Sequence, residues 1–438
     1  LGVDAASWSH VEPAGLVVTS TLERRHHIPV PNAGVWPGLA DVPHHPVRAF
    51  VAERLFRRIV AGLPLRVTFP DGSTIGGGDR SAPTMIITSP DGLFNRLGED
   101  VHIGFGEAYM VGDWTPAEGT DLADLLSVFA ARASRLVPPW MQRFRFTVQS
   151  DHPSTERNTR SGSKANIHRH YDLSNDLFTQ FLDETMTYSA AWFEPGDDLA
   201  AAQHRKIDGV LDYAHVGEGS TVLDIGCGWG ALAIRAAQRG ARVTGLTLSA
   251  EQKDLAEERI AEAGAGDRVD IRLQDYRDVS EQFDAVVSVE MIEAVGEDFL
   301  PEYFATIDRV MRPGGRAGLQ AITMPHDRMV ATRHSYSWIN KYIFPGGFLP
   351  SLRLIDEVLA EHTSLAVFER RNLRQHYVET LQRWRLRFLE RWDEISGLGF
   401  DDTFRQMWSF WLAYSEAGFR ASYLGVSQLQ LARSPFTR

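Results

Sequence analysis

The chain has 438 residues, more than one ordinary hydrophobic core supports, which predicts one large domain and a smaller one. Its net charge of −12 argues against a protein that coats nucleic acid, because phosphate binding needs clustered lysine and arginine. The hydrophobic content of 43% is typical of a globular protein, and no apolar run reaches the roughly 20 residues of a membrane-spanning helix.

The N-terminal third begins with a stretch rich in proline, glycine and histidine, which predicts an irregular arm over residues 1–40 without a secretory signal. Apolar residues at helical spacing, among them Val47, Phe50 and Val51, then predict a helix in PVRAFVAERLFRRIVAGL (46–63). Its arginines form either a solvated basic face or a contact with lipid headgroups. Strands are predicted in 65–78, with a turn at Asp71-Gly72, and in 84–89. Residues 41–135 therefore read as a small α+β domain, associated with lipid.

Residues 136–165 carry proline, serine, asparagine and charge without periodicity, which predicts a linker. From there to residue 438 strands and helices alternate. Strands are predicted at 221–226, 242–248, 269–275, 284–289 and 316–324, and helices at 231–240, 250–264 and 299–311. Such alternation builds a parallel sheet with helices on both faces, so the fold class is α/β.

The segment VLDIGCGWG (222–230) combines a strand with a glycine-rich turn into a helix. Gly226 and Gly228 leave room for the backbone to approach a ligand at the carboxyl edge of the sheet. Asp224 lies inside the strand just before the first glycine, which favours S-adenosylmethionine (SAM) over a dinucleotide. Residues 166–438 are therefore predicted to be a Rossmann-like class I SAM methyltransferase domain. Histidine and cysteine lack the spacing of metal ligands.

The next two strands supply further candidates for the SAM site. Thr247 lies where an acid usually binds the ribose hydroxyls. Ser249 and Gln252 either contact the cofactor or only cap the following helix, because S-x-x-Q is a capping box. Asp275 and Tyr276 follow the third strand and are placed to meet the adenine.

The segment VSVEMIEAVG (287–296) places Glu290 and Glu293 among apolar residues, where a strand is predicted to run into a helix. In a poorly screened pocket two ionised carboxylates repel each other, and any third anion, by several kcal/mol at an effective dielectric of about 20. The pair can instead share a proton, which raises the pKa of one acid toward the useful range of a base. Glu290 could also do no more than cap or pair near a helix start.

Several long motifs occur in the order in which a known family carries them: NIHRHYDLSNDLFTQFLDETMTYSAAWF (166–193), VLDIGCGWGALAIRAA, TGLTLSAEQ, SVEMIEAVG, WINKYIFPGGFLPS (338–351) and QHYVETLQRW (375–384). Together they closely resemble the cyclopropane fatty acid synthase family, and GEAYMVGDWT (106–115) resembles the end of its smaller N-terminal domain. The resemblance implies transfer of a methyl group from SAM to the cis double bond of an acyl chain in a membrane phospholipid. The single cysteine, Cys227, fits a reducing compartment, so we expect a cytoplasmic protein. The phospholipid substrate that the resemblance implies adds a peripheral contact at the inner face of the membrane.

The residues that match the family's SAM contacts are Tyr188, Ser189, Asp224, Gly226, Thr247, Gln252, Asp275 and Tyr276. The family's catalytic site holds a bicarbonate ion that removes a proton, and Glu293, Ile322 and Tyr377 match its surroundings. Two other positions differ, since Ala190 replaces a cysteine and Gln320 a histidine, and Glu290 stands where relatives often carry glycine. Bound bicarbonate is therefore left open. We expect Glu293 to lie near Tyr377 and to accept the proton directly, so that Glu293→Gln would abolish the product while SAM still binds.

The product depends on which proton leaves the carbocation. Loss from the transferred methyl group with ring closure gives a cyclopropane, whereas a preceding hydride shift gives a methylene branch. The alanine, the glutamine and EMIEAVG resemble actinobacterial enzymes that make 10-methylene stearoyl lipids, precursors of tuberculostearic acid, and we expect that product. A cyclopropane synthase, a methyltransferase of soluble small molecules and a non-catalytic lipid-binding protein are the alternatives, and a partner reductase and an oligomer are possible. Aromatic residues that could stabilise the cation or simply pack in the core are Tyr336, Trp338, Tyr342, Phe344 and Phe348.

Overall fold

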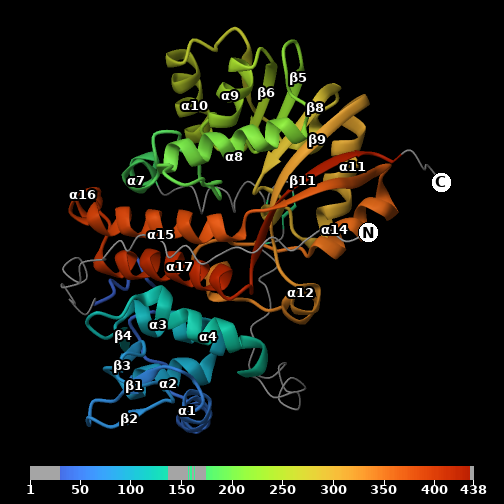
Figure 1. The fold of residues 1–438 in the computed structure, drawn as a ribbon. Coiled ribbons are helices and arrows are strands. Elements are labelled where there is room, and N and C mark those ends of the chain that lie inside the picture. Colours follow the sequence, from blue (N-terminus) through green and yellow to red (C-terminus); the bar gives the residue numbers. More distant parts are fainter. Residues whose placement is uncertain (1–29, 137–155, 157, 160–161, 163–173, 435–438) are drawn as a thin grey trace.

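The computed structural model describes residues 30–136, 156, 158–159, 162 and 174–434 of the chain. The expected arm before residue 30, most of the expected linker and the motif residues 166–173 lie outside the described residues. In the described part, a large sheet and a small sheet lie at opposite ends of the molecule, with a layer of helices between them (Figure 1).

The large sheet of the described chain has seven strands in the order β10-β11-β9-β8-β5-β6-β7. Its strands are β5 (Thr221–Ile225), β6 (Arg242–Thr247), β7 (Val269–Leu273), β8 (Phe283–Val289), β9 (Met311–Thr323), β10 (Leu365–Asn372) and β11 (Gly425–Arg433). Strands β5 to β9 pair in parallel, which confirms the predicted parallel sheet. The antiparallel strands β10 and β11 extend it on one side and were not predicted.

Helices cover both faces of this sheet, as the alternating pattern predicted. The helices are α8 (Leu199–Tyr213), α9 (Ala231–Gln238), α10 (Ala250–Glu262), α11 (Leu300–Val310) and α14 (Leu352–His362). Successive side chains of a strand point to opposite faces, so Val222 packs with α8 and α9 while Leu223 packs with α11 and α14. Both residues are fully buried, which explains why β5 carries consecutive apolar residues rather than an alternating pattern.

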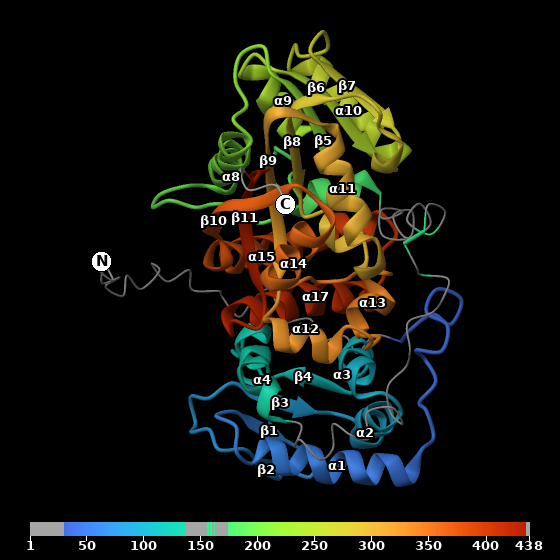
Figure 2. The same ribbon diagram turned by 90° about the vertical axis from the view of Figure 1, so that its right-hand side faces the viewer.

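The small sheet has the order β2-β1-β3-β4 and carries its own helices (Figure 2). Its elements are α1 (Pro46–Val60), β1 (Arg66–Thr68), β2 (Thr74–Ile75), β3 (Thr84–Ile87), α2 (Pro90–Glu99), α3 (Val101–Met110), β4 (Trp114–Pro116) and α4 (Leu122–Leu136). The helix and strands predicted here are confirmed. Of the apolar residues predicted to share one face of α1, Val60 is buried, but Val47, Phe50 and Val51 are 76%, 58% and 56% exposed. The helix also buries Phe56, which packs edge-on against Phe94 of α2.

The layer between the sheets consists of α7 (Asn175–Phe181), α12 (His326–Thr332), α13 (Trp338–Tyr342), α15 (Arg374–Glu390), α16 (Trp392–Gly397) and α17 (Asp402–Arg420). Buried charges join it to the N-terminal part. Arg385 of α15 contacts Asp121 before α4 at 2.7 Å and Glu416 of α17 at 3.2 Å. Glu107 of α3 accepts hydrogen bonds from Lys341 at 2.5 Å and from Tyr342 at 2.7 Å. The buried Arg385 pairs fix how the two packed units are oriented, because breaking them leaves a buried charge without a partner.

None of the helices in the described ranges has the length and apolar composition required to cross a bilayer.

Candidate active site at the carboxyl edge of the large sheet

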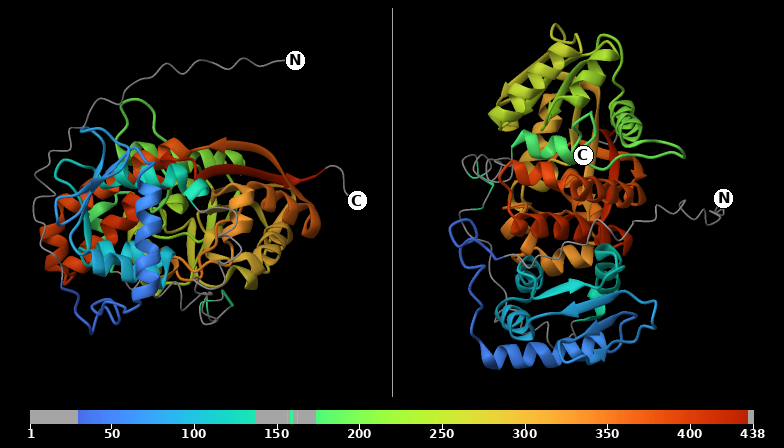
Figure 3. Two further views of the ribbon diagram at one scale, coloured as in Figure 1. Left: turned by 90° about the horizontal axis from the view of Figure 1, so that it is seen from below. Right: turned by 90° about the vertical axis from the view of Figure 1, so that its left-hand side faces the viewer.

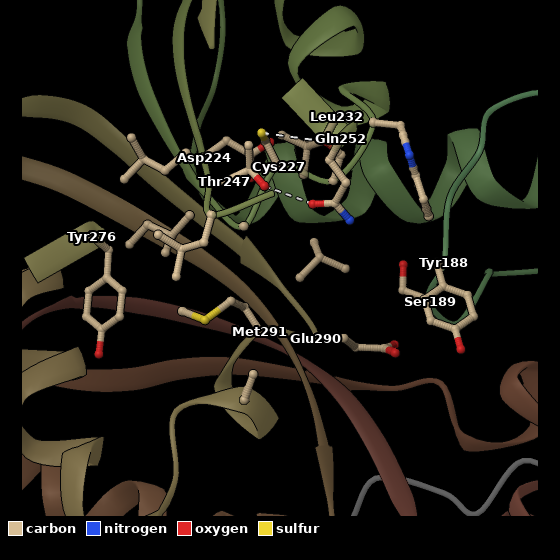
Figure 4. A pocket seen from close by; sticks show the side chains of 18 of the residues that line it. Tyr188, Ser189, Asp224, Cys227, Leu232, Thr247, Gln252, Tyr276, Glu290 and Met291 are labelled. Carbon is tan, nitrogen blue, oxygen red and sulfur yellow. Dashed lines mark hydrogen bonds between the residues drawn. The ribbon is translucent and has the colours of Figure 1, made fainter. Parts of the chain in front are cut away.

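A cavity of about 200 Å³ lies at the carboxyl ends of β5, β6 and β8 (Figure 4). This is the edge at which open α/β sheets bind their ligands. Sequence-predicted residues that line the cavity are Tyr188, Ser189, Asp224, Gly226, Gly228, Thr247, Gln252, Asp275, Tyr276 and Glu290. The sequence analysis missed Asn158, Lys206 and Met291, which also line it. Lys206 is one polar residue on an amphipathic helix, a position that carries no motif signal.

The glycine-rich turn between β5 and α9 forms one wall of the cavity. Gly226, Gly228 and Gly230 all have positive φ angles, of +82°, +52° and +84°, which other residues adopt only with strain. A side chain at Gly228 would meet no atom within 4 Å, so the glycine leaves open space beside the cavity. The turn lines the cavity with Gly226 and Gly228, at the place where the sequence analysis expects backbone to approach a ligand.

Asp224 lies at the buried end of β5 and is 2% exposed. Its Oδ2 is buried and has no hydrogen-bond partner among the described residues. Burial raises the pKa of Asp224 to about 7, against the opposing effect of the Lys206 ammonium. A buried, unsatisfied carboxylate at a cavity wall is suited to bind a cationic ligand.

The residues that follow β6 have divided roles. Thr247 donates a hydrogen bond to Oε1 of Gln252 at 2.8 Å, and both residues line the cavity (Figure 4). Ser249 does not line it. The hydroxyl of Ser249 accepts a hydrogen bond from the Gln252 N–H at 3.1 Å, so it caps α10, which is the structural alternative that the capping-box pattern offered.

Asp275 and Tyr276 lie beyond the end of β7 and line the cavity. Tyr276 lies across the cavity from Tyr188 and Ser189 (Figure 4). Asp275 accepts two hydrogen bonds from the Arg277 guanidinium, at 2.9 and 2.6 Å. The ring of Tyr276 packs edge-on against Tyr303, with 5.6 Å between centroids. Tyr276 therefore offers an aromatic surface at the end of the cavity where the sequence placed the adenine.

The carboxylate of Glu290 is held by three donors from distant parts of the chain. Its Oε1 accepts from the N–H of Ala190 at 2.9 Å and from the Gln320 side chain at 2.8 Å. Its Oε2 accepts from the hydroxyl of Tyr377 at 2.7 Å. The backbone of Glu290 has a φ of +49°, a conformation that favours glycine. The predicted helix start is wrong here, since β8 ends at Val289 and only a short 3-10 turn follows at Ile292–Ala294.

Glu293 lies next to Glu290 but has a different environment. Its Oε1 accepts a hydrogen bond from the N–H of Ile322 on β9, while its Oε2 is buried without a partner in the described part of the chain. Burial raises the pKa of both acids, and the neighbouring Glu290 charge raises that of Glu293 further. Glu293 is therefore the protonated, neutral acid of the pair, whereas the hydrogen-bond donors around Glu290 favour the ionised form of that residue.

A chain of side-chain amides orients Gln320. Its Nε2 donates to the Ala190 carbonyl at 3.1 Å as well as to Glu290, and its Oε1 accepts from Gln428 at 3.1 Å. Oε1 of Gln428 in turn accepts from Arg371 at 2.9 Å. Because each amide is fixed by its neighbour, the Gln320 side chain must present its NH₂ group to Glu290.

The aromatic segment divides into two groups. Trp338 and Tyr342 contact α3 of the N-terminal part, the former through the Met110 sulfur at 3.4 Å, and they serve as packing residues there. The hydroxyl of Tyr336 donates to Glu156 at 3.0 Å. Phe344 packs on Trp411 with 5.9 Å between centroids, and the N–H of Phe348 donates to the Glu293 carbonyl at 2.9 Å. Of the five, therefore, Phe348 is bonded directly to the acid segment.

The catalytic candidates thus form two adjoining groups, Glu290 with Gln320 and Tyr377, and Glu293 with Ile322. The model of the mycolic acid cyclopropane synthetase family matches residues 158–429. The chain belongs to this family. It is a SAM-dependent methyltransferase with the class I fold.

Relatives in this family cover most of the chain. The tuberculostearic acid methyltransferase UfaA1 of Mycobacterium tuberculosis is 51% identical over 91% of this chain and 95% of its own length. The cyclopropane-fatty-acyl-phospholipid synthase of Escherichia coli is 36% identical over 81% of this chain and 89% of its own.

Solved structures of the family match about three fifths of the chain. The cyclopropane synthase MmaA2 from Mycobacterium tuberculosis superposes with a TM-score of 0.58 at 32% identity, covering 62% of this chain and 98% of that one. The mycolic acid cyclopropane synthase CmaA1, in complex with S-adenosylhomocysteine and CTAB, gives a TM-score of 0.57 at 30% identity, covering 61% and 97%.

Proposed function

We propose that this methyltransferase acts on the cis double bond of an unsaturated acyl chain, of the oleoyl type, in a membrane phospholipid and produces a 10-methylene branch. The observation that carries the proposal is the Glu290 carboxylate, held by Ala190, Gln320 and Tyr377 at the cavity wall. An alkene has no proton to remove before it reacts, so the enzyme needs a base only afterwards, for the carbocation. In this protein the Glu290 carboxylate is that base.

The relatives support the branched product over the ring. The 51% identical relative is named for tuberculostearic acid, whereas the relative named for cyclopropane synthesis is 36% identical. Glu290 itself supports the same choice, because it stands where the cyclopropane synthase resemblance expects glycine.

The residues of the cavity fit SAM. Asp224 offers a buried carboxylate with an unsatisfied oxygen to a cationic group, the glycine turn leaves open space, and Tyr276 offers a ring face to the adenine. We assign the ribose side to Thr247 and Gln252, and the segment at Tyr188 and Ser189 to the methionyl part. When bound, SAM supplies an electrophilic methyl group on a sulfonium.

Glu290 accepts the proton that the carbocation releases from the methyl group. Each carboxylate oxygen can accept about two hydrogen bonds, and Oε1 already accepts two. Among the described residues, Oε2 accepts only from the Tyr377 hydroxyl, so it keeps one lone pair for the proton. Glu293 remains neutral and adds no second negative charge. No separate bicarbonate ion is needed, because the Glu290 carboxylate occupies the donors that would hold a small oxyanion.

Aromatic side chains exclude water from this region. Tyr188 stacks on Trp384 of α15, with 5.3 Å between centroids and 25° between planes, and contacts Trp411 of α17 at 5.9 Å. Trp384 and Trp411 are buried, so the wall beside Tyr188 is dry. Water would quench a carbocation as an alcohol, and aromatic faces also stabilise a cation by about 0.5–2 kcal/mol each.

The product identifies the reaction. We expect lipids from a bacterial host that expresses this protein and is supplied with oleate to gain one carbon and two hydrogens as a methylene branch. Ring and branch have the same mass, so fragmentation of the isolated methyl esters by mass spectrometry is the measurement. A cyclopropane fragment pattern would replace the proposed product with the alternative, and unmodified oleate despite SAM binding would favour a lipid-binding protein.

We further propose that α1 carries a peripheral contact with anionic lipid. Val47, Phe50 and Val51 form an exposed apolar stripe, and Arg54 and Arg58 continue it along the same helical face. The helix runs across the end of the molecule opposite β6 and β7 (Figures 2 and 3). Exposed apolar residues beside arginines match the interface of an anionic bilayer.

This contact predicts that Phe50→Ser reduces sedimentation with vesicles containing phosphatidylglycerol by several-fold. The wild-type protein should bind these vesicles in a salt-sensitive manner and bind phosphatidylcholine vesicles less. Phe368→Ser is the matched control, because Phe368 on β10 is 51% exposed on the other sheet. Equal losses for the two variants would contradict a contact through α1.

A further inference from the structure

Lys206 is a buried ammonium at the wall of the cavity that no sequence motif indicated. It projects from α8, is 1% exposed and lines the cavity. Its Nζ donates a hydrogen bond to Oγ of Ser189 at 2.5 Å. Among the described residues, no carboxylate oxygen lies within 4.0 Å of Nζ. Burying a charge without a close ion-pair partner costs free energy of folding, which points to a functional role for Lys206.

The direction of this hydrogen bond determines what Ser189 can do. An ammonium group can only donate, so Oγ of Ser189 is the acceptor. The hydroxyl hydrogen of Ser189 is thereby directed away from Lys206, and Ser189 itself lines the cavity. One turn earlier on α8, Gln203 donates to the Ser189 carbonyl at 2.9 Å. Helix α8 thus holds the segment that presents Tyr188 and Ser189 to the cavity and the Ala190 N–H to Glu290.

Three acids surround the ammonium at longer range. Asp183 follows α7, Asp224 ends β5 and Glu290 follows β8, and each attracts the Lys206 charge. Glu293 and Tyr377 complete the titratable groups next to Glu290. Burial lowers the pKa of Lys206 to about 8, so the residue is still mainly cationic at neutral pH. The Lys206 charge in turn opposes the effect of burial on the pKa of Asp224 and of Glu290.

Lys206 is also connected to the acid through the backbone. Its carbonyl accepts a hydrogen bond from Nε2 of Gln428 at 2.9 Å, and the same nitrogen donates to Gln320. Gln320 donates to Glu290. The position of α8 is therefore fixed relative to both the cofactor-facing segment and the acid.

We propose that Lys206 is a positioning residue of methyl transfer, whose ammonium turns the Ser189 hydroxyl toward the cofactor and provides the positive charge that faces the Asp224 and Glu290 carboxylates. The effect on Glu290 rests on the proposed role of Glu290 as the base. The effects on Ser189 and Asp224 concern SAM binding alone. The two can therefore be measured separately.

Lys206→Met tests the proposal, because methionine has a similar length without charge or donor. The affinity for SAM at pH 7, measured by calorimetry, should fall about tenfold or more. The pH at which kcat reaches half its maximum should rise by about one unit or more, since loss of a nearby cation disfavours the ionised acids. At alkaline pH, where the acids ionise in any case, the kcat of the variant should approach that of the wild type.

Lys253→Met is the matched control, because Lys253 lies on α10, does not line the cavity and pairs with Glu257 across one helical turn. It should leave SAM affinity and the pH profile unchanged. A folded Lys206→Met protein with wild-type affinity and profile would overturn the proposal. A wild-type protein that binds SAM but forms no product would instead overturn the proposed function, while the affinity comparison would still decide the role of Lys206 at Ser189.

Ser189→Ala provides a second test if Lys206→Met fails to fold, as circular dichroism would show. This variant removes the acceptor of the ammonium but leaves its charge. SAM affinity should fall while the midpoint of the pH profile stays in place. A shifted midpoint, or an unchanged affinity, would overturn the proposal.

Discussion

Replacement of Glu290 by glutamine should lower kcat for lipid methylation by about 10²–10⁴-fold, the range expected for loss of a general base. Glutamine keeps the size of the side chain, but its amide oxygen is far less basic than a carboxylate oxygen. SAM affinity should change little, because the cationic group of SAM is expected to bind at Asp224 and not at Glu290. Kinetics with radiolabelled SAM and phospholipid vesicles measure the first effect, and calorimetry measures the second. A variant with near-normal kcat would remove Glu290 from the chemistry.

Glu290→Gly provides the complementary variant. Glycine relieves the strain of the +49° φ angle and removes the carboxylate, while Ala190, Gln320 and Tyr377 still point their donors at the vacated position. Added bicarbonate or formate should therefore restore part of the lost activity in this variant and have no effect on the wild type. Strong stimulation of the wild-type enzyme by bicarbonate would contradict the idea that a side chain replaces the ion.

Glu293→Gln separates the two acids. If Glu293 is the neutral member of the pair, glutamine is close to it in shape and charge, and kcat at pH 7 should fall far less than in Glu290→Gln. The raised pKa of Glu293 also costs stability when the group must ionise. Between the ordinary value of 4.5 and the raised value the folded state binds more protons than the unfolded state, so stability falls as pH rises through this window. The melting temperature of Glu293→Gln should fall less over that range than that of the wild type.

The second large effect is expected at Asp224, where asparagine should weaken SAM binding at pH 7.5 by about 10–100-fold. A hydrogen bond to a charged group contributes about 1.5–3 kcal/mol, and Oδ2 of Asp224 has no other partner in the described structure. The pKa of Asp224 is raised to about 7, so the carboxylate is mostly protonated below that pH. Wild-type affinity should therefore rise on the order of tenfold between pH 5.5 and 7, because only the ionised form attracts a cation.

Asp224→Asn should abolish this pH dependence as well as weaken binding. The control is Asp254→Asn, since Asp254 is exposed on α10. It removes an equal charge away from the cavity and should leave both the affinity and its pH dependence as in the wild type. An Asp224→Asn protein whose SAM affinity still rises with pH would assign the titration to another group.

The local features of the sequence were sufficient to predict the cofactor edge. An apolar strand at 221–226, a glycine turn and an amphipathic helix together predicted β5, the turn and α9, because each depends on neighbours a few residues apart. The same holds for α10, whose start at Ser249 follows from its capping pattern. The local sequence could not decide between the two roles of Ser249. Only the position of β6 relative to the cavity shows that the Ser249 hydroxyl caps α10 and does not line the site.

The tertiary structure alone decided how the acids are paired. From the sequence, Tyr377 was expected near Glu293, yet its hydroxyl donates to Glu290, whose other donors come from positions 190 and 320. These contacts join segments about 30 to 100 residues apart, so they depend on strand order and helix packing rather than on spacing. The exposed apolar stripe of α1 and the burial of Lys206 also depend on tertiary packing. Periodicity shows that a helix has two faces, but only the neighbours that pack against it determine which one is buried.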